Sequence, residues 1–503
     1  MKNTTISSGA TAMTIGLLAS FLSGNGLAQT EDPLEKERKA AQAALEEAIP
    51  RAAKDPARPM YHFRPPARWM NDICGAIYHD GYHHIFYQSN PYMDDDYGWG
   101  WGHARSKDLV HWEELPWALP PMEHRGERRC NSGCVTLDGN GRPMIFYTFV
   151  PQTSAKRSQW GVTALDDDLI RWRRVGEGPL MEAGKNGVPM DVPGGWSDPY
   201  VFEKNGRTFV KFKACGGLVC EAQNEALTEW KYIGKLEGVT GECPNVFPVG
   251  DKWVIIRSTH PVSYVTGDLV LKGDEIRFDV RKPATVMDFG YGKDRPPGRS
   301  RYCRGLYGTN TYLDDKGRRI LFGWISGFKA GRGWNGCMSL PRVISIDDDG
   351  CLIQTPAPEL AKLRGEHTRV TNLAIQDEFK LIEGAKGRQI EISAEFAPGS
   401  AKAFGMKLRS SDDAGRAITL RYADGNLNVA GTEVPLEPGG DNGTIRLRVF
   451  LDRSVMEVFI DGGQAAVTRV EYPQEEDVGI AVFADNGRVT LKSLDVWQIK
   501  AIW

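Results

Sequence analysis

One hairpin pattern returns five times between residues 76 and 326, and this repeat constrains the fold more than any other feature. Each copy has an apolar strand, a tight polar turn that contains glycine, and an aromatic-rich strand. A polar residue beside glycine is the usual chemistry of a β-hairpin turn. The copies are AIYHDGYHHIFYQ from 76, VTLDGNGRPMIFYTF from 135, YVFEKNGRTFVKFKA from 200, VFPVGDKWVIIRST from 246 and TYLDDKGRRILFGWIS from 311.

A second pattern follows three of these hairpins, with small residues, a polar turn, a leucine and then a tryptophan: HARSKDLVHWEEL, VTALDDDLIRWRRV and EAQNEALTEWKYI. Looser versions, GDLVLKGDEIRFDV and MSLPRVISIDDDGCLI, follow the fourth and fifth hairpins. Five units of four strands, roughly 45 to 65 residues each, predict a five-bladed β-propeller. A β-sandwich of similar length is the alternative, but the regular pairing of two hairpin types favours the propeller.

The pattern changes near residue 370. Short alternating strands such as RQIEISAEF and AITLRYA are separated by turns rich in Gly, Asp and Asn, which is typical of an antiparallel sandwich. The prolines of TPAPELAKLRGEH break any strand and mark the junction. We therefore expect an all-β protein, with a five-bladed β-propeller over residues 59–360 followed by a C-terminal β-sandwich over residues 370–503.

The N-terminus is typical of an export signal. A weakly positive start precedes TAMTIGLLASFLSG, which is short for a membrane span, and Gly26 and Ala28 are small residues suited to a cleavage site. Residues 1–28 are expected to be a removed signal peptide, which would place the protein outside the cell or in the periplasm. A buried helix or an uncleaved anchor is the alternative. Residues 29–58, rich in Ala, Glu and Lys, are predicted to form a helical spacer, and no other segment is expected to cross a membrane.

Composition narrows the functional classes. The 41% hydrophobic and 25% charged content is that of a soluble globular protein, and the net charge of −3 argues against a nucleic-acid binder. The nine cysteines show no zinc-ligand spacing, so we expect no metal and no cofactor. Some cysteines are expected to pair in an exported chain, with Cys130/Cys134 and Cys215/Cys220 the nearest in sequence. The sequence carries no indication of the oligomeric state.

Three carboxylates occupy matching places in this repeat. In a propeller the first strand of each blade lines the central channel, so the residues just before these strands surround one mouth of the channel. Asp72 lies there in WMNDICG, Asp198 in GWSDPY and Glu242 in TGECPNV. We therefore expect the three side chains to face one another in one pocket.

Clustered carboxylates suit glycoside cleavage. Like charges raise one another's pKa, so one carboxylate can act as an ionised nucleophile while another stays protonated as the acid. Taken singly, each of these residues is typical of a turn before a strand. Three at matching repeat positions favour a shared site. A calcium site is a further alternative, because hard cations take oxygen ligands.

The motifs around these residues support a family assignment. In chain order they are WMND, FYQSNP, WGHARSKDLVHWEELPWALPP, SDPYVF, ECPNVF, LFGWISG and WNGCMSLPR. Together they resemble glycoside hydrolase family 32, the invertase, inulinase and levanase group of β-fructofuranosidases. LRVFLDRSVMEVFIDGG, residues 447–463, resembles the C-terminal sandwich of that family. Family 43, another furanosidase group on a five-bladed propeller, lacks the WMND motif and is the weaker match.

The resemblance implies an exported, retaining hydrolase that cleaves β-fructosidic bonds in sucrose or fructans by double displacement. It implies that Asp72 is the nucleophile that attacks the fructosyl anomeric carbon and that Glu242 is the acid/base. Asp198 would hold fructose hydroxyls and stabilise the transition state. The positions that match the fructose subsite or its edge are Trp69, Asn71, Gln88, Trp99, Ser132 and Trp324.

This sequence departs from the family pattern in three places. NDICG replaces NDPNG, Asp96 replaces an aromatic residue for which Trp99 is a nearby substitute, and SDP replaces RDP. Ser197 therefore stands where an arginine clamps fructose hydroxyls, and a serine cannot make that forked, charged contact. Three interpretations stay open. Arg301 or Arg304 reaches the same mouth, the substrate is not a plain terminal fructose, or the protein binds sugar without turnover.

Overall fold

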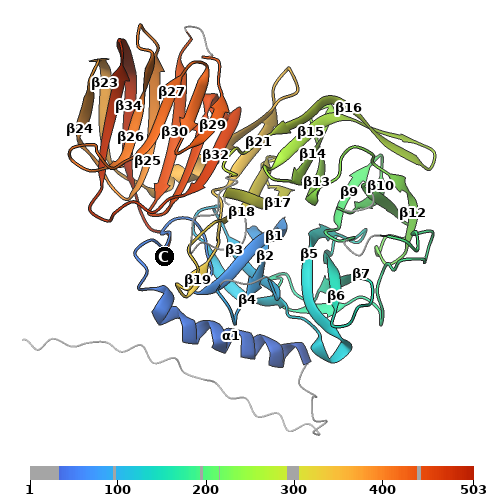
Figure 1. Cartoon of the computed structure of the whole chain (residues 1–503). Helices are drawn as coiled ribbons and strands as arrows, with labels where there is room; N and C mark the ends of the chain where they lie inside the picture. Colours follow the sequence, from blue (N-terminus) through green and yellow to red (C-terminus); the bar gives the residue numbers. More distant parts are fainter. Residues whose placement is uncertain (1–32, 95–97, 193–195, 214–215, 292–304, 439–442) are drawn as a thin grey trace, which may run out of the picture.

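Seven β-sheets and one long helix make up the described part of the chain in the computed structural model, which covers residues 33–94, 98–192, 196–213, 216–291, 305–438 and 443–503. Five sheets of four or five strands form a ring, and two six-stranded sheets form a second body beside it (Figure 1). The prediction of a five-bladed β-propeller followed by a β-sandwich is confirmed. No helix in these ranges is long and apolar enough to span a membrane, and the predicted signal peptide lies outside them.

The five hairpins seen in the sequence are the first two strands of the five blades. Blade one contains β1 (Arg68–His79), β2 (Tyr82–Asn90), β3 (Gly100–Ser106) and β4 (Glu113–Leu119). Blade two contains β5 (Glu127–Leu137), β6 (Pro143–Pro151), β7 (Ser158–Ala164) and β8 (Trp172–Arg174). Blade three contains β9 (Tyr200–Lys204), β10 (Arg207–Lys211), β11 (Leu218–Ala222) and β12 (Trp230–Lys235).

Blade four contains β13 (Glu242–Val249), β14 (Lys252–Ser258), β15 (Ser263–Lys272) and β16 (Glu275–Val286). Blade five contains β17 (Gly305–Leu313), β18 (Arg319–Ser326), β20 (Cys337–Met338), β21 (Arg342–Ile346) and β22 (Leu352–Pro356). Short 3₁₀ segments lie at Glu123–Arg125, Pro358–Leu363 and Asp461–Gly463.

The ring closes through its first strands. Each of β1, β5, β9, β13 and β17 contacts the next, and β17 contacts β1 again. The last blade also gives a short strand to the first: β19 (Trp334–Asn335) pairs in parallel with β1, with Arg68 opposite Trp334. Residues distant in sequence therefore meet at the channel, as the repeat predicts.

The leucine–tryptophan pattern has one structure in three blades. Leu109, Leu169 and Leu227 all adopt left-handed backbone, with φ of 67°, 56° and 54°. The indole N–H of the tryptophan three residues later donates to the carbonyl of that leucine, at 3.2, 2.8 and 2.8 Å. This hydrogen bond satisfies a buried indole, which explains why each pattern ends in tryptophan rather than in another aromatic residue.

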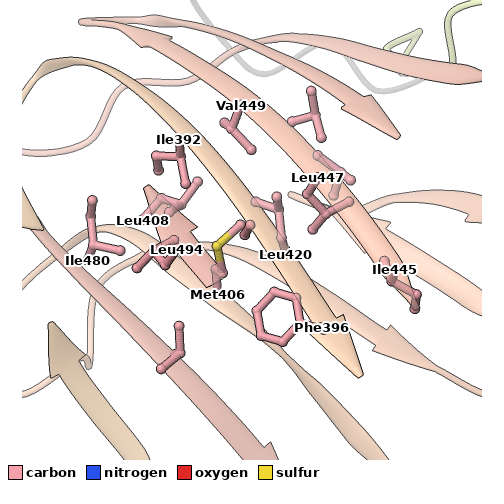
Figure 2. Close-up of a cluster of buried hydrophobic side chains, with 14 of the residues drawn as sticks. Ile392, Phe396, Met406, Leu408, Leu420, Ile445, Leu447, Val449, Ile480 and Leu494 are labelled. Atoms are coloured by element: carbon pink, nitrogen blue, oxygen red, sulfur yellow. The ribbon is translucent and has the colours of Figure 1, made fainter. Parts of the chain in front are cut away.

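The sandwich core lies between two six-stranded sheets. One sheet has the order β23 (Arg364–Gln376), β34 (Arg488–Ile499), β25 (Gln389–Ala397), β30 (Ile445–Asp452), β31 (Val455–Ile460) and β32 (Ala465–Val470). The other has the order β24 (Phe379–Lys386), β33 (Gly479–Asp485), β26 (Ala403–Ser410), β27 (Ile418–Ala423), β28 (Asn426–Val429) and β29 (Thr432–Pro435). Figure 2 shows aliphatic side chains such as Ile392, Leu408 and Leu447 meeting in this core.

The charged N-terminal segment is helical, as its composition predicts, and forms α1 (Pro33–Ala52). It runs along the propeller (Figure 1) and is anchored to it, because the Arg38 guanidinium donates to the carbonyls of Trp117 and Ala118 at 2.8 and 3.2 Å. Ala41 and Leu45 pack against Trp117. The helix is therefore part of the folded body rather than only a spacer.

The candidate pair Cys130/Cys134 does not form a disulfide, because both thiols are free and buried. The two residues lie on one strand, β5, where four residues span about 13 Å, and a disulfide needs Cα atoms within about 7 Å. Cys220 is likewise a free thiol, so the structure does not contain the Cys215/Cys220 pair, although Cys215 itself lies outside the described residues.

Candidate active site

Four of the five first strands carry a β-bulge near their beginning. A bulge re-aims the side chain inside it. The bulges enclose Asp72 in β1, Ser132 in β5, Cys243 in β13 and Gly308 in β17. The other three residues each meet the Asp72 carboxylate, which lies between them.

Asp72 is held from three other blades. Its Oδ2 accepts a hydrogen bond from the Ser132 hydroxyl at 2.7 Å and one from the Cys243 thiol at 3.5 Å. Its Oδ1 lies against the backbone of Gly308, where a Cβ would come within 2.4 Å of that oxygen. Any larger residue at 308 would displace the carboxylate, so the glycine is required by this close approach.

Asp198 and Glu242 belong to the same cluster. Asp198 precedes β9 in left-handed backbone, with φ of 57°, and its Oδ2 accepts the backbone N–H of Cys243 at 3.2 Å. Glu242 begins β13, and 45% of its side chain is exposed, against 8% for Asp198. The exposed carboxylate can therefore meet a leaving group or water, whereas Asp198 stays inside.

Glu242 has two further partners. Lys213 Nζ donates to Glu242 Oε1 at 2.5 Å, and the Tyr307 hydroxyl donates to Oε2 at 2.8 Å. The Tyr307 ring stacks on His260 with the ring centres 4.3 Å apart. These partners fix the orientation of Glu242 and surround it with positive and hydrogen-donating groups.

The three carboxylates have different electrostatic environments. Burial raises the pKa of Asp72 to about 6, and the charges of Asp198 and Glu242 add to this, while the Ser132 hydrogen bond opposes it. Burial also raises the pKa of Asp198, against the effect of Lys213. Burial acts in the same direction on Glu242, but Lys213 more than offsets it and the pKa of Glu242 is lowered.

The predicted subsite residues of blade one form a chain of hydrogen bonds. The Trp69 indole donates to Asn71 Oδ1 at 2.8 Å, the Asn71 amide reaches Gln88 Oε1 at 3.5 Å, and the Gln88 amide donates to the Cys130 carbonyl at 3.1 Å. All are buried, and Trp69 meets Trp324 edge-on with centroids 5.7 Å apart. Four predicted residues, Trp69, Asn71, Gln88 and Trp324, therefore form one contacting group, and a fifth, Ser132, binds Asp72 directly.

Two other predicted site residues, Trp99 and Ser197, lie outside this hydrogen-bonded chain. Trp99 packs against Trp117, 5.4 Å between centroids, at the edge where α1 meets the propeller. Ser197 is fully buried and its hydroxyl hydrogen-bonds the Asp198 carboxylate. Arg301 and Arg304, predicted as replacements for the missing arginine, lie outside the described residues, as does Asp96.

Within the described ranges no group of three His, Cys, Asp or Glu side chains has the arrangement of a metal site. The donors that meet the carboxylates are instead a hydroxyl, a thiol, a phenol and an ammonium group. These donors fix the orientation of the carboxylates.

Comparison with known families agrees with this geometry. Residues 62–356 match the glycosyl hydrolases family 32 N-terminal domain, and residues 359–498 match the glycosyl hydrolases family 32 C terminal. The chain belongs to glycosyl hydrolase family 32. As a member of this family it is a glycoside hydrolase.

Relatives of this family 32 enzyme are similar along most of its length. The levanase of Bacillus subtilis is 30% identical, with 89% of this chain and 71% of that protein covered. The sucrose-6-phosphate hydrolase of Escherichia coli is 28% identical, covering 88% and 94%. The structure of fructan 1-exohydrolase IIa from Cichorium intybus superposes with a TM-score of 0.76 at 21% identity, covering 89% and 98%, and shows the same fold.

Sequence reasoning missed three residues of this family 32 site: Cys243, Tyr307 and Lys213. Cys243 directly follows Glu242 inside the same bulge. Tyr307 lies just before the bulge of β17, as Glu242 lies just before that of β13, and each is four residues before its hairpin pattern, so the rule applied to the other blades would have found it. Lys213 follows the second strand of blade three, and no repeat rule points there.

Proposed function

We propose that this enzyme hydrolyses β-fructosidic bonds in sucrose or fructans with retention of configuration. The observation that carries the proposal is the meeting of Asp72, Asp198 and Glu242, from three blades, in one hydrogen-bonded cluster. The named relatives, a levanase and a sucrose-6-phosphate hydrolase, support the choice of a fructoside as substrate.

In the first step Asp72 attacks the anomeric carbon of the fructosyl unit. The carbon–oxygen bond to the leaving group breaks, and Glu242 gives its proton to that oxygen. Ser132 and Cys243 hold one Asp72 oxygen in place, so the other is oriented for attack. Asp198, buried beside them, stabilises the positive charge that develops on the sugar ring.

In the second step Glu242, now ionised, takes a proton from water. The hydroxide attacks the same carbon, and the bond to Asp72 breaks to release fructose and the free carboxylate. The exposure of Glu242 gives water access to the side of the cluster where this step takes place.

Product analysis tests the proposal directly. The protein is incubated with sucrose, inulin and levan, and released fructose is followed by NMR before its anomers equilibrate. Release of the β-anomer first supports a retaining hydrolase. Binding of these sugars without release of fructose supports the alternative of a non-catalytic carbohydrate-binding protein, and release from a different furanoside supports altered specificity.

Replacing Glu242 with glutamine is expected to lower kcat/KM for sucrose by about 10³-fold, because the leaving oxygen loses its proton donor. An aryl β-fructofuranoside with an acidic phenol needs little protonation, so its kcat/KM is expected to fall far less. Initial rates on both substrates measure the difference. Equal losses on both would contradict the acid role of Glu242.

The activity of the wild-type enzyme is expected to be highest at acidic pH. The reactive form carries one proton, on Glu242, while Asp72 is ionised. Because the pKa of Asp72 is raised to about 6 and that of Glu242 is lowered, the pair loses its last proton near pH 6. kcat/KM for sucrose should therefore decline above about pH 6, and also at low pH where both acids are protonated. A profile that stays level through pH 8 would contradict this.

Export is part of the proposal and rests on sequence alone. The short apolar stretch and the small residues before position 29 support removal of residues 1–28 and location outside the cell or in the periplasm. N-terminal sequencing of the mature protein tests it.

A further inference from the structure

Ser197 leaves a gap in the charge pattern of the site, because a family 32 sequence of the RDP type has a guanidinium at this position. The structure places another cation next to it. Lys213 lies two residues beyond β10, and its backbone N–H donates to the Ser197 carbonyl at 3.0 Å. Position 213 is therefore the direct backbone neighbour of position 197 on the adjacent chain segment.

The side chain of Lys213 points into the carboxylate cluster. Its Nζ is 2.5 Å from Glu242 Oε1 and 4.0 Å from Asp198 Oδ2. Only 23% of the side chain is exposed, and burial, which would favour a neutral amine, is outweighed by Asp198 and Glu242, so the pKa of Lys213 is raised. The lysine stays charged throughout the pH range in which the carboxylates titrate.

We propose that Lys213 is a positioning residue that replaces the missing arginine: from the segment beside Ser197 it supplies the positive charge that orients Glu242 and Asp198. The proposal rests on the proposed function, because those two carboxylates are the groups through which Lys213 acts. It does not need Arg301 or Arg304. The positive charge that Ser197 lacks is supplied by Lys213, whose backbone is hydrogen-bonded to that of Ser197.

This placement has a chemical consequence for the acid step. Both oxygens of Glu242 accept hydrogen bonds in the free enzyme, one from Lys213 and one from Tyr307. An oxygen that accepts from an ammonium group is held in its ionised form and cannot give a proton to a leaving group. For the first step one oxygen of Glu242 must carry a proton, so either Lys213 or Tyr307 must release its oxygen when substrate binds, and a displaced Lys213 keeps Asp198 as a partner.

Several charged or titratable groups face this pair and contribute to its pH dependence. They come from β1, from the segment before β9, from β13, from the loop after β14 and from β17, and they are Asp72, Asp198, Cys243, His260 and Tyr307. None of these groups opposes protonation of Glu242 as directly as Lys213, which donates a hydrogen bond to its carboxylate.

The test compares Lys213→Met with Lys213→Arg. Methionine keeps the aliphatic stem and removes the charge that holds the pKa of Glu242 down, so the acidic limb of kcat/KM for sucrose, where Glu242 loses its proton from the doubly protonated pair, is expected to move up by about 1 pH unit. kcat should fall about tenfold, while KM changes less than about threefold, because Lys213 acts through the carboxylates rather than by binding sugar. Lys213→Arg keeps the charge and should keep the wild-type limb.

Lys231→Met is the matched control, because Lys231 belongs to the same blade and forms an exposed ion pair with Asp274 at 3.3 Å. It is expected to leave the pH profile unchanged. A Lys213→Met enzyme with the wild-type acidic limb, or a Lys213→Arg enzyme that shifts as far as Lys213→Met, would overturn the proposal. If Lys213→Met fails to fold, Lys213→Gln takes its place.

A second readout separates this inference from the proposed function. ¹³C NMR of labelled Glu242 reports the titration of its carboxylate with no substrate present, in both wild-type and Lys213→Met protein. A rise in the Glu242 pKa in the variant supports the role of Lys213 even if no fructoside is cleaved, and an unchanged pKa overturns it. Loss of the proposed function would instead show as absence of fructose release by the wild-type enzyme.

Discussion

Replacing Asp72 with asparagine is expected to reduce fructose release from sucrose by roughly 10⁴-fold or more, because an amide cannot form the covalent intermediate. The substitution keeps the shape of the side chain, and the Ser132 hydroxyl can still donate to the remaining carbonyl oxygen. The expected loss is therefore in kcat rather than in sugar binding. Steady-state kinetics with sucrose, together with calorimetric binding of fructose, measure the two separately.

The stability of the Asp72→Asn variant distinguishes lost chemistry from lost folding. The folded-state pKa of Asp72 is raised to about 6 by burial, so ionised Asp72 opposes folding at neutral pH, and this cost decreases as pH falls below about 6 and is gone below about pH 4, where Asp72 of the unfolded chain is also protonated. The asparagine variant is therefore expected to melt at a higher temperature than the wild type at pH 7. Asp167→Asn, in an exposed turn, is the control for both measurements. An Asp72→Asn enzyme that retains more than a few per cent of its activity would exclude Asp72 as the nucleophile.

The second large effect is expected at the junction of propeller and sandwich. Arg342 of β21 is fully buried and donates to Glu457 of β31 at 2.5 Å and to Asp288, after β16, at 3.1 Å. Glu457 also meets His62 Nε2 at 3.1 Å, and His62 Nδ1 meets Asp452 Oδ2 at 3.0 Å. Burial disfavours the charged imidazole, but the hydrogen bonds that its two N–H groups donate to Asp452 and Glu457 raise the pKa of His62 to about 9. The two domains are thus joined by a buried network of alternating charge.

Arg342→Met is expected to destabilise the protein by about 3–5 kcal/mol, because Asp288 and Glu457 are left as buried charges without their cation. The midpoint of denaturant unfolding, followed by tryptophan fluorescence, should fall accordingly. Neutralising both acids in addition, with Asp288→Asn and Glu457→Gln, should recover much of the loss because no unpaired charge then remains.

Arg277→Met provides the comparison for an ion pair at the surface. Arg277 and Asp279 are 2.9 Å apart with about half of each side chain exposed, and such surface pairs contribute little to stability. Equal midpoints for the Arg342 and Arg277 variants would show that the buried network does not hold the domains together.

Much of the fold could be predicted because each repeat unit is specified by residues close together in the sequence. Each hairpin carries its own turn chemistry, and the leucine–tryptophan pattern carries its own left-handed leucine and indole hydrogen bond. The packing of α1 could not be predicted in this way, because half of its buried stripe is small alanines and the stripe includes a charged residue, Arg38. Only the propeller shows that Arg38 meets two backbone carbonyls.

The candidate site divides in the same manner. Asp72, Asp198 and Glu242 could be found because they hold equivalent places in repeated units, so their positions in space follow from their positions in the repeat. Cys130 and Cys134 were poor candidates for a disulfide. Four residues apart on one extended strand, they are too far apart in space to bond. Lys213 could not be found, because the pairing of its segment with that of Ser197 cannot be read from the sequence of either segment.

The sequence by itself determined the architecture and the identities of the three acids, because hydrophobic alternation and turn chemistry act over a few residues and repeat along the chain. Tertiary structure alone decided which of these acids is buried against apolar side chains and which is paired with a lysine. The pKa of a carboxyl depends on burial and on charges within a few ångströms in space. Those neighbours come from four blades and become neighbours only when the ring closes.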